Sequence, residues 1–245
     1  MTVGIDPAWD QDVERILVVT AHPDDVDFGA AGSVAAWTDR GIEVSYCVVT
    51  DGDAGGSDRG AKRADVAALR RREQTAAAEA VGVSDITFLG YPDGRLEPSI
   101  ALRRDISRVI RIKKPQRVVA QSPERNYQRI FASHPDHRAA GEAALCAVYP
   151  DARNPFAHME LLDEEGLEPH VVDEVYLMAM AQGDVVVDIT DTVDRKLEAL
   201  RCHESQYDNW DDLSERVRGW ARLNAEQNGL GEGHSAETFL RVPTG

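Results

Sequence analysis

Short apolar runs rich in β-branched residues alternate with longer helical segments along most of this 245-residue chain. Such runs are too short for free-standing helices and are typical of buried strands. Alternating strands and helices predict an α/β fold, Rossmann-like, with a mainly parallel sheet and helices on both faces. We expect strands at residues 15–20, 44–50, 85–89, 117–121, 175–181 and 185–189, and the main helices at 23–40, 64–80, 99–113, 136–148, 191–207 and 212–224.

The length favours a single domain over residues 1–245, with a core at about 14–208 and a C-terminal helical extension at 209–245. The net charge of −16 argues against a protein that tracks nucleic-acid phosphates or binds an anionic membrane surface. The three cysteines are far apart, and we expect free thiols in a reducing compartment. With neither a signal peptide nor a membrane span predicted, we expect a cytoplasmic protein.

One polar cluster follows the first predicted strand directly. His22, Asp24 and Asp25 surround Pro23, a residue suited to the first turn of a helix. A strand end that meets a helix start is where open α/β sheets bind their ligands. The cluster is therefore a candidate site.

A second cluster repeats this pattern after the fourth predicted strand. It consists of His134, Pro135, Asp136 and His137, again at the start of a helix. Two such turns at one sheet edge would pool three histidines and three aspartates, which suit zinc or a similar divalent metal. Carboxylates and imidazoles left over could act as acid and base in metal-assisted hydrolysis. The alternative is that these residues merely cap two helices.

These clusters resemble the paired motifs of the LmbE-like, or PIG-L, zinc-dependent N-acetylglucosaminyl deacetylases. The resemblance covers roughly residues 14–208 in order. It also includes the segments 50–55, 91–94, 114–116, 187–190, 196–200 and 203–206, together with Arg70 and Glu73.

The resemblance implies a role for each matched residue. The metal ligands would be His22, Asp25 and His137. Asp24 would be the general base, and His134 would stabilise the oxyanion and help to protonate the leaving amine. Asp136 would lie behind the ligands and orient His134, and Arg70 and Asp93 would contact the sugar.

The same resemblance implies a reaction, and at one position this chain departs from the sequence pattern of the family. Zn²⁺ would activate a water that Asp24 deprotonates, and the products would be acetate and a free amino sugar. Mycothiol-pathway members carry a tyrosine two residues before the second motif, where this chain has Ala132. Tyr127 is a candidate replacement.

Alternatives stay open at this point. The chain could be an amidase that cleaves a larger acyl group from a glucosamine conjugate, as mycothiol-conjugate amidases do, or a metal- or sugar-binding module without catalysis. The expected partner is a small amino-sugar substrate, and we expect no binding to nucleic acid or to a membrane. Assembly into a homo-oligomer stays an open alternative. His203 falls in a predicted helix, and we expect it to be structural.

Overall fold

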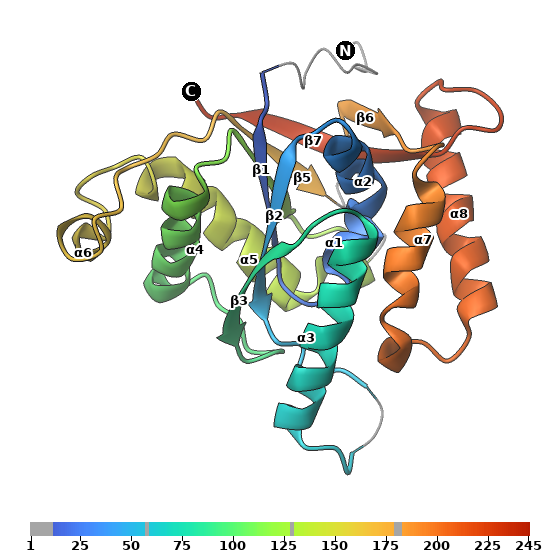
Figure 1. The fold of residues 1–245 in the computed structure, drawn as a ribbon, viewed down its shortest axis with the longest axis horizontal. Helices are drawn as coiled ribbons and strands as arrows, with labels where there is room; N and C mark the ends of the chain where they lie inside the picture. The colour runs from blue at the N-terminus through green and yellow to red at the C-terminus, as the bar shows by residue number, and fades with distance from the viewer. Residues whose placement is uncertain (1–11, 57–58, 128–129, 179–182) are drawn as a thin grey trace.

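A seven-stranded sheet lies between two layers of helices in the computed structural model, which describes residues 12–56, 59–127, 130–178 and 183–245 (Figure 1). The strands are β1 Arg15–Thr20, β2 Glu43–Thr50, β3 Asp85–Tyr91, β4 Arg117–Gln121, β5 Glu174–Met178, β6 Val185–Asp188 and β7 Ala236–Pro243. Their spatial order is β3-β2-β1-β4-β5-β7-β6. The first five strands are parallel, and β7 runs antiparallel to both β5 and β6. The predicted α/β class is confirmed.

The order of the strands reverses between β1 and β4. From β1 the chain builds outward through β2 to β3, and it then returns to place β4 on the other side of β1. Val19 of β1 is in register with Ala120 of β4, so the two strands end side by side. A reversal of this kind opens a crevice at the carboxyl ends of the strands, the usual ligand site of such sheets.

Helices cover both faces of the sheet because the buried strands carry apolar side chains on both sides. The helices are α1 Asp25–Gly29, α2 Ala31–Asp39, α3 Arg63–Ala80, α4 Ile100–Lys113, α5 Pro135–Cys146, α6 Met159–Asp163, α7 Val193–Arg201 and α8 Trp210–Gln227. Leu17 and Val19 share one apolar cluster with α4 and α5. Ile16 and Val18 share the opposite cluster with α2 and α3. Figure 1 shows α7 and α8 outside the second layer.

Several predicted boundaries differ from the structure. The helix predicted at 23–40 is broken at Ala30, whose φ of −146° is not helical, and becomes α1 and α2. The helix predicted at 191–207 ends at Arg201, so His203 lies after it. The extension predicted as helical at 209–245 also supplies β7, whose partners in the sheet lie upstream in the chain. Of the strand predicted at 175–181, residues 179–181 lie outside the described ranges.

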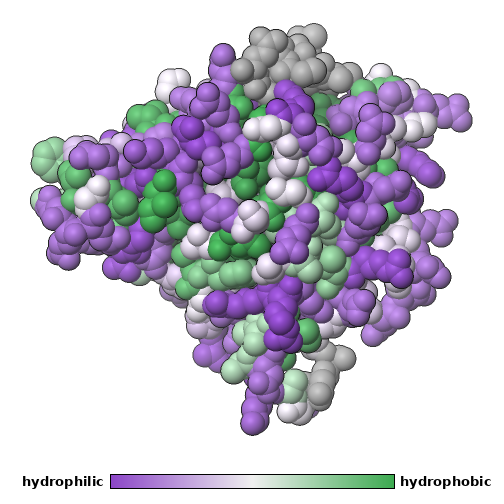
Figure 2. Space-filling view, viewed as in Figure 1, coloured by the Kyte–Doolittle hydropathy of each residue, from purple (hydrophilic) through white to green (hydrophobic). Residues whose placement is uncertain are grey.

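Polar side chains cover most of one face of the molecule. Figure 2 shows hydrophilic residues over most of the face that it presents, as the high charge content suggests. None of the helices in the described parts of the chain combines the length and apolar character that a membrane crossing needs.

Candidate active site

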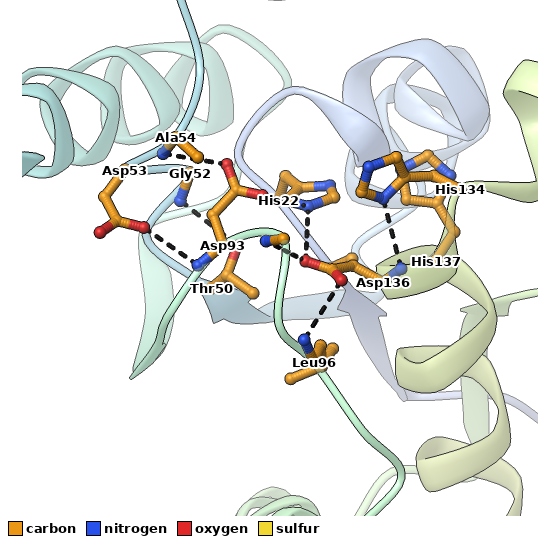
Figure 3. Close-up of polar contacts among 12 residues, drawn as sticks. His22, Thr50, Gly52, Asp53, Ala54, Asp93, Leu96, His134, Asp136 and His137 are labelled. Carbon is orange, nitrogen blue, oxygen red and sulfur yellow. Dashed lines mark hydrogen bonds and ion pairs between the residues drawn. The ribbon is translucent and has the colours of Figure 1, made fainter.

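The two polar motifs meet where β1 and β4 end. The strands are held together there by the side chain of Gln121, whose carbonyl oxygen accepts a hydrogen bond from the Ala21 amide at 2.8 Å. The first motif then enters α1, and the second enters α5 after a polar loop. Figure 3 shows His22, His134 and His137 gathered in one place, although more than a hundred residues separate the first from the others in the chain. The three imidazole centroids lie 5.1–5.2 Å apart.

The first motif forms a tight turn around Asp25. The His22 amide donates to one carboxylate oxygen of Asp25 at 2.7 Å, which closes the turn. Asp24 precedes α1, but its side chain makes no capping hydrogen bond. Helix capping therefore does not explain why an aspartate stands at position 24.

The second motif places His134 just before α5 and Pro135 in its first turn. Nδ1 of His134 accepts a long hydrogen bond from the Asp136 amide at 3.3 Å, so this histidine does cap its helix. Because Nδ1 accepts, the proton of the neutral ring is on Nε2. Burial and the nearby imidazoles of His22 and His137 lower the pKa of His134, which favours this neutral form.

Asp25 joins the two motifs. Its Oδ2 lies 3.3 Å from Nδ1 of His22, and its Oδ1 lies 3.0 Å from Nε2 of His137. Burial opposes charge on all three groups, but their mutual attraction outweighs it. The pKa of His22 is raised to about 12, that of His137 is also raised, and that of Asp25 is held well below its usual range. Two imidazole nitrogens facing one carboxylate match the ligand set of a catalytic zinc site.

The opposite nitrogen of His22 faces two further carboxylates. Nε2 lies 3.3 Å from Oδ2 of Asp136 and 3.1 Å from Oδ1 of Asp93. A histidine that binds metal through one nitrogen commonly donates the other N–H to a carboxylate, which fixes the ring. Asp136 and Asp93 are placed to do this for His22 (Figure 3).

Asp136 also ties a neighbouring loop to the site. Its carboxylate accepts from the amides of Gly94 and Leu96, at 2.7 and 3.2 Å. From the sequence we expected the side chain of Asp136 to orient His134. The contact between them is instead made by the backbone amide of Asp136, which donates to Nδ1 of His134. Asp93, a predicted sugar contact, has one carboxylate oxygen on His22 and the other on the Ala54 amide at 3.2 Å. The carboxylates of Asp93 and Asp136 thus both engage His22.

Arg70 of α3 lies against Asp24 and is only 4% exposed. It donates to Oδ2 of Asp24 at 3.1 Å, to the Pro23 carbonyl at 2.6 Å and to the Gly52 carbonyl at 3.2 Å. Gly52 has a φ of +60°, and a Cβ there would lie 2.3 Å from the guanidinium. The glycine therefore permits the close approach of Arg70, a residue for which we predicted a sugar contact.

The pKa of Asp24 is raised to about 7. Burial is the largest cause, the guanidinium of Arg70 opposes it, and the negative charge of Asp25 adds to the rise. A carboxylate with a pKa near neutrality beside a candidate metal site has the property that a general base requires.

Three residues behind Asp24 were not predicted as part of the site. Gln74 of α3 and Asp27 of α1 are fully buried, and so is His203, which we expected to be structural. His203 belongs to the segment 203–206 of the family resemblance, and that match was the available signal.

Tyr127, the candidate replacement for the tyrosine missing at Ala132, has 85% of its surface exposed to solvent.

The chain is similar to proteins of one family. Residues 17–148 match the model of the PIG-L family, described as GlcNAc-PI de-N-acetylase. Diacetylchitobiose deacetylase of Thermococcus kodakarensis is 34% identical over 233 residues, covering 95% of this chain and 84% of that protein. The probable N-acetyl-α-D-glucosaminyl L-malate deacetylase 2 of Bacillus anthracis is 32% identical over 204 residues, covering 79% and 81%.

A solved structure shares the fold. N,N'-diacetylchitobiose deacetylase from Pyrococcus horikoshii, solved with an inhibitor, superposes with a TM-score of 0.87 at 32% identity, covering 96% of this chain and 85% of that one. The sequence similarity and the structural similarity to these deacetylases thus both extend over nearly the whole chain.

Proposed function

The chain belongs to the PIG-L, or GlcNAc-PI de-N-acetylase, family, and from this premise we propose that it is a zinc-dependent hydrolase that removes the N-acetyl group from a small molecule containing N-acetylglucosamine. One observation carries the proposal. Asp24, with a pKa near 7, directly precedes Asp25, the carboxylate that faces two imidazoles.

The metal would be held by Nδ1 of His22, the carboxylate of Asp25 and Nε2 of His137. Each of the two nitrogens already faces the Asp25 carboxylate, and nitrogen and oxygen donors of this kind suit Zn²⁺. When bound, such an ion polarises the acyl oxygen and makes a water molecule more acidic. Asp93 and Asp136 would keep the His22 ring in the orientation that presents Nδ1 to the ion.

Asp24 would take the proton from the attacking water. Its pKa of about 7 leaves it ionised often enough to accept a proton, and basic enough to hold it. The held proton is then available to the leaving nitrogen as the amide C–N bond breaks. The products are acetate and a free amine.

His134 would stabilise the oxyanion as a hydrogen-bond donor. Its Nδ1 accepts from the Asp136 amide, and its lowered pKa favours a neutral ring with the proton on Nε2. A donor aimed at the developing charge contributes about 3 kcal/mol in comparable sites. The resemblance also implied that His134 helps to protonate the leaving amine; a neutral His134 that donates to the oxyanion leaves Asp24 as the source of that proton.

The substrate class rests on the relatives. Those that cover 79% or more of this chain are named as deacetylases of diacetylchitobiose, of N-acetylglucosaminyl malate or of an N-acetylglucosaminyl inositol. We place the enzyme in the cytoplasm, an assignment that its three free cysteines support.

A substrate screen tests the proposal. Metal-loaded protein is mixed with N-acetylglucosamine, with diacetylchitobiose, with N-acetylglucosaminyl inositol and with a glucosamine conjugate that carries a larger acyl group. Acetate and free amine are measured with and without a chelator. The proposal predicts chelator-sensitive release of acetate and amine in equal amounts from at least one of them. Release confined to conjugates with larger acyl groups would identify an amidase instead, and amine release that survives the removal of all metal would contradict the proposed chemistry.

A further inference from the structure

A buried hydrogen-bonded chain lies behind Asp24. Gln74, Asp27 and His203 come from α3, α1 and the turn after α7, and each is 0% exposed. Burying polar side chains is costly unless they are hydrogen-bonded to one another. Within the described part of the chain, none of the three makes a hydrogen bond or ion pair with His22, Asp25 or His137, so metal binding does not account for them.

The hydrogen bonds of this network converge on Asp27 from both sides. The Asp24 amide donates to Oε1 of Gln74 at 2.7 Å, and Nε2 of Gln74 donates to Oδ2 of Asp27 at 3.0 Å. Nε2 of His203 donates to the same oxygen of Asp27 at 2.8 Å. An ionised carboxylate only accepts hydrogen bonds, so Asp27 forces the NH₂ group of Gln74 toward itself. The carbonyl oxygen of Gln74 is thereby turned toward the Asp24 amide.

The hydrogen bond with Gln74 helps to keep the backbone of Asp24 in an unusual conformation. Its φ is +85°, in the left-handed region that residues other than glycine rarely adopt. A residue in this region is strained and persists only where its surroundings fix it. Two contacts fix it here: Gln74 binds its amide, and Arg70 binds the preceding carbonyl of Pro23.

We propose that Gln74 is a positioning residue for Asp24, and that Asp27 and His203 act through it by setting the direction of its amide group. The left-handed turn at Asp24 places Asp24 and Asp25 as successive residues with separate tasks, one toward Arg70 and the other toward the two imidazoles. The role assigned to Gln74 rests on the proposed function of Asp24 as the base. The hold on the backbone does not depend on that function.

A matched pair of glutamines tests the proposal. Gln74→Met keeps the length of the side chain but removes both hydrogen bonds. Gln116 provides the control, because its Oε1 also accepts from a backbone amide, that of Arg15 at 2.9 Å, at the opposite end of β1. For metal-loaded Gln74→Met we expect kcat to fall about 100-fold, the loss typical of a displaced catalytic group, with KM and metal content unchanged. Gln116→Met should keep the kcat of the wild type.

A pair at His203 covers the case in which Gln74→Met does not fold. Gln can present an NH₂ group where His203 has its Nε2–H, whereas Leu cannot. We therefore expect His203→Gln to retain kcat within about threefold and His203→Leu to lose at least tenfold, both with the metal content of the wild type. Equal kcat in the two variants would contradict the proposal, as would a wild-type kcat in folded, metal-loaded Gln74→Met.

A crystal structure separates this proposal from the proposed function. If the wild type releases no acetate from any acetylated amino sugar, the deacetylase assignment fails, and the backbone at residue 24 still decides the role of Gln74. We expect Asp24 to leave the left-handed region, or to lose its contact with Arg70, in Gln74→Met but not in Gln116→Met. An unchanged Asp24 in Gln74→Met would overturn the proposal.

Discussion

Arg70 donates a hydrogen bond to the carboxylate of Asp24 at 3.1 Å, and both groups are largely removed from water. This contact opposes the effect of burial, so the pKa of Asp24 is a balance between the two. Replacing Arg70 by Gln removes the positive charge and should raise the pKa of Asp24 further.

A higher pKa of Asp24 in Arg70→Gln should shift the acidic limb of the pH–rate profile. Asp24 must be ionised to act as the base, so activity should rise with pH through its pKa. In the wild type we expect the positive charge of a bound metal to move that limb below the pKa that Asp24 has in the metal-free protein. In Arg70→Gln we expect the limb at higher pH and a lower kcat/KM at neutral pH. Arg72→Gln is the control, because Arg72 is exposed on the same helix, and it should leave the acidic limb in place. An acidic limb that does not move in Arg70→Gln would contradict this account.

His137→Ala should abolish stable metal binding, because it removes one of the two imidazoles that face Asp25. The bound metal per chain, measured by elemental analysis after dialysis, should fall from one to near zero. His170→Ala is the matched control, since that imidazole contacts the Pro115 carbonyl rather than the site. Full zinc occupancy in His137→Ala would overturn the assignment of the ligands.

Metal affinity should increase as the pH rises. The pKa values of His22 and His137 are raised in the metal-free protein, so a proton on each ring competes with the metal for its nitrogen. Release of two protons predicts an affinity about 100-fold higher per pH unit, up to the pH at which the first ring titrates. Calorimetry in buffers of different ionisation enthalpy counts the protons. Binding that releases none would show that the two rings are not the ligands.

Asp136→Asn should weaken metal binding without abolishing it. The Asp136 carboxylate contacts Nε2 of His22, and partners of this kind typically change metal affinity 10- to 100-fold. Asp188→Asn is a suitable control, because Asp188 also contacts a histidine, His234, but both are partly exposed. A titration with a competing chelator gives the affinity. Equal metal affinities of the wild type and Asp136→Asn would show that Asp136 does not orient His22 for metal binding.

Much of the fold could be predicted because strands and helices leave local patterns in the sequence. β1 and β4 were predicted at their observed residues, since each is a short run that is buried on both faces. Two similar motifs after strands of one parallel sheet must meet at one edge, so the grouping of His22 with His134 and His137 followed from topology. β7 was missed because its alternation is weak and its pairing partners lie far upstream.

The layer behind the site could not be predicted in the same way. Arg70 stands among several charged residues of α3, and nothing local shows that it folds inward onto Asp24 while Arg72 faces solvent. Gln74, Asp27 and His203 come from three elements and meet only in the folded chain. The left-handed backbone of Asp24 depends on those contacts, whereas glycine would be the residue that local propensity favours there.

The most direct test is acetate release by Asp24→Asn, measured beside its metal content. The carboxamide keeps the shape of the side chain but cannot take a proton from water. We expect one metal per chain, as in the wild type, and a kcat at least 100-fold lower on the best acetylated amino sugar. Wild-type turnover by a fully metal-loaded Asp24→Asn protein would contradict the account.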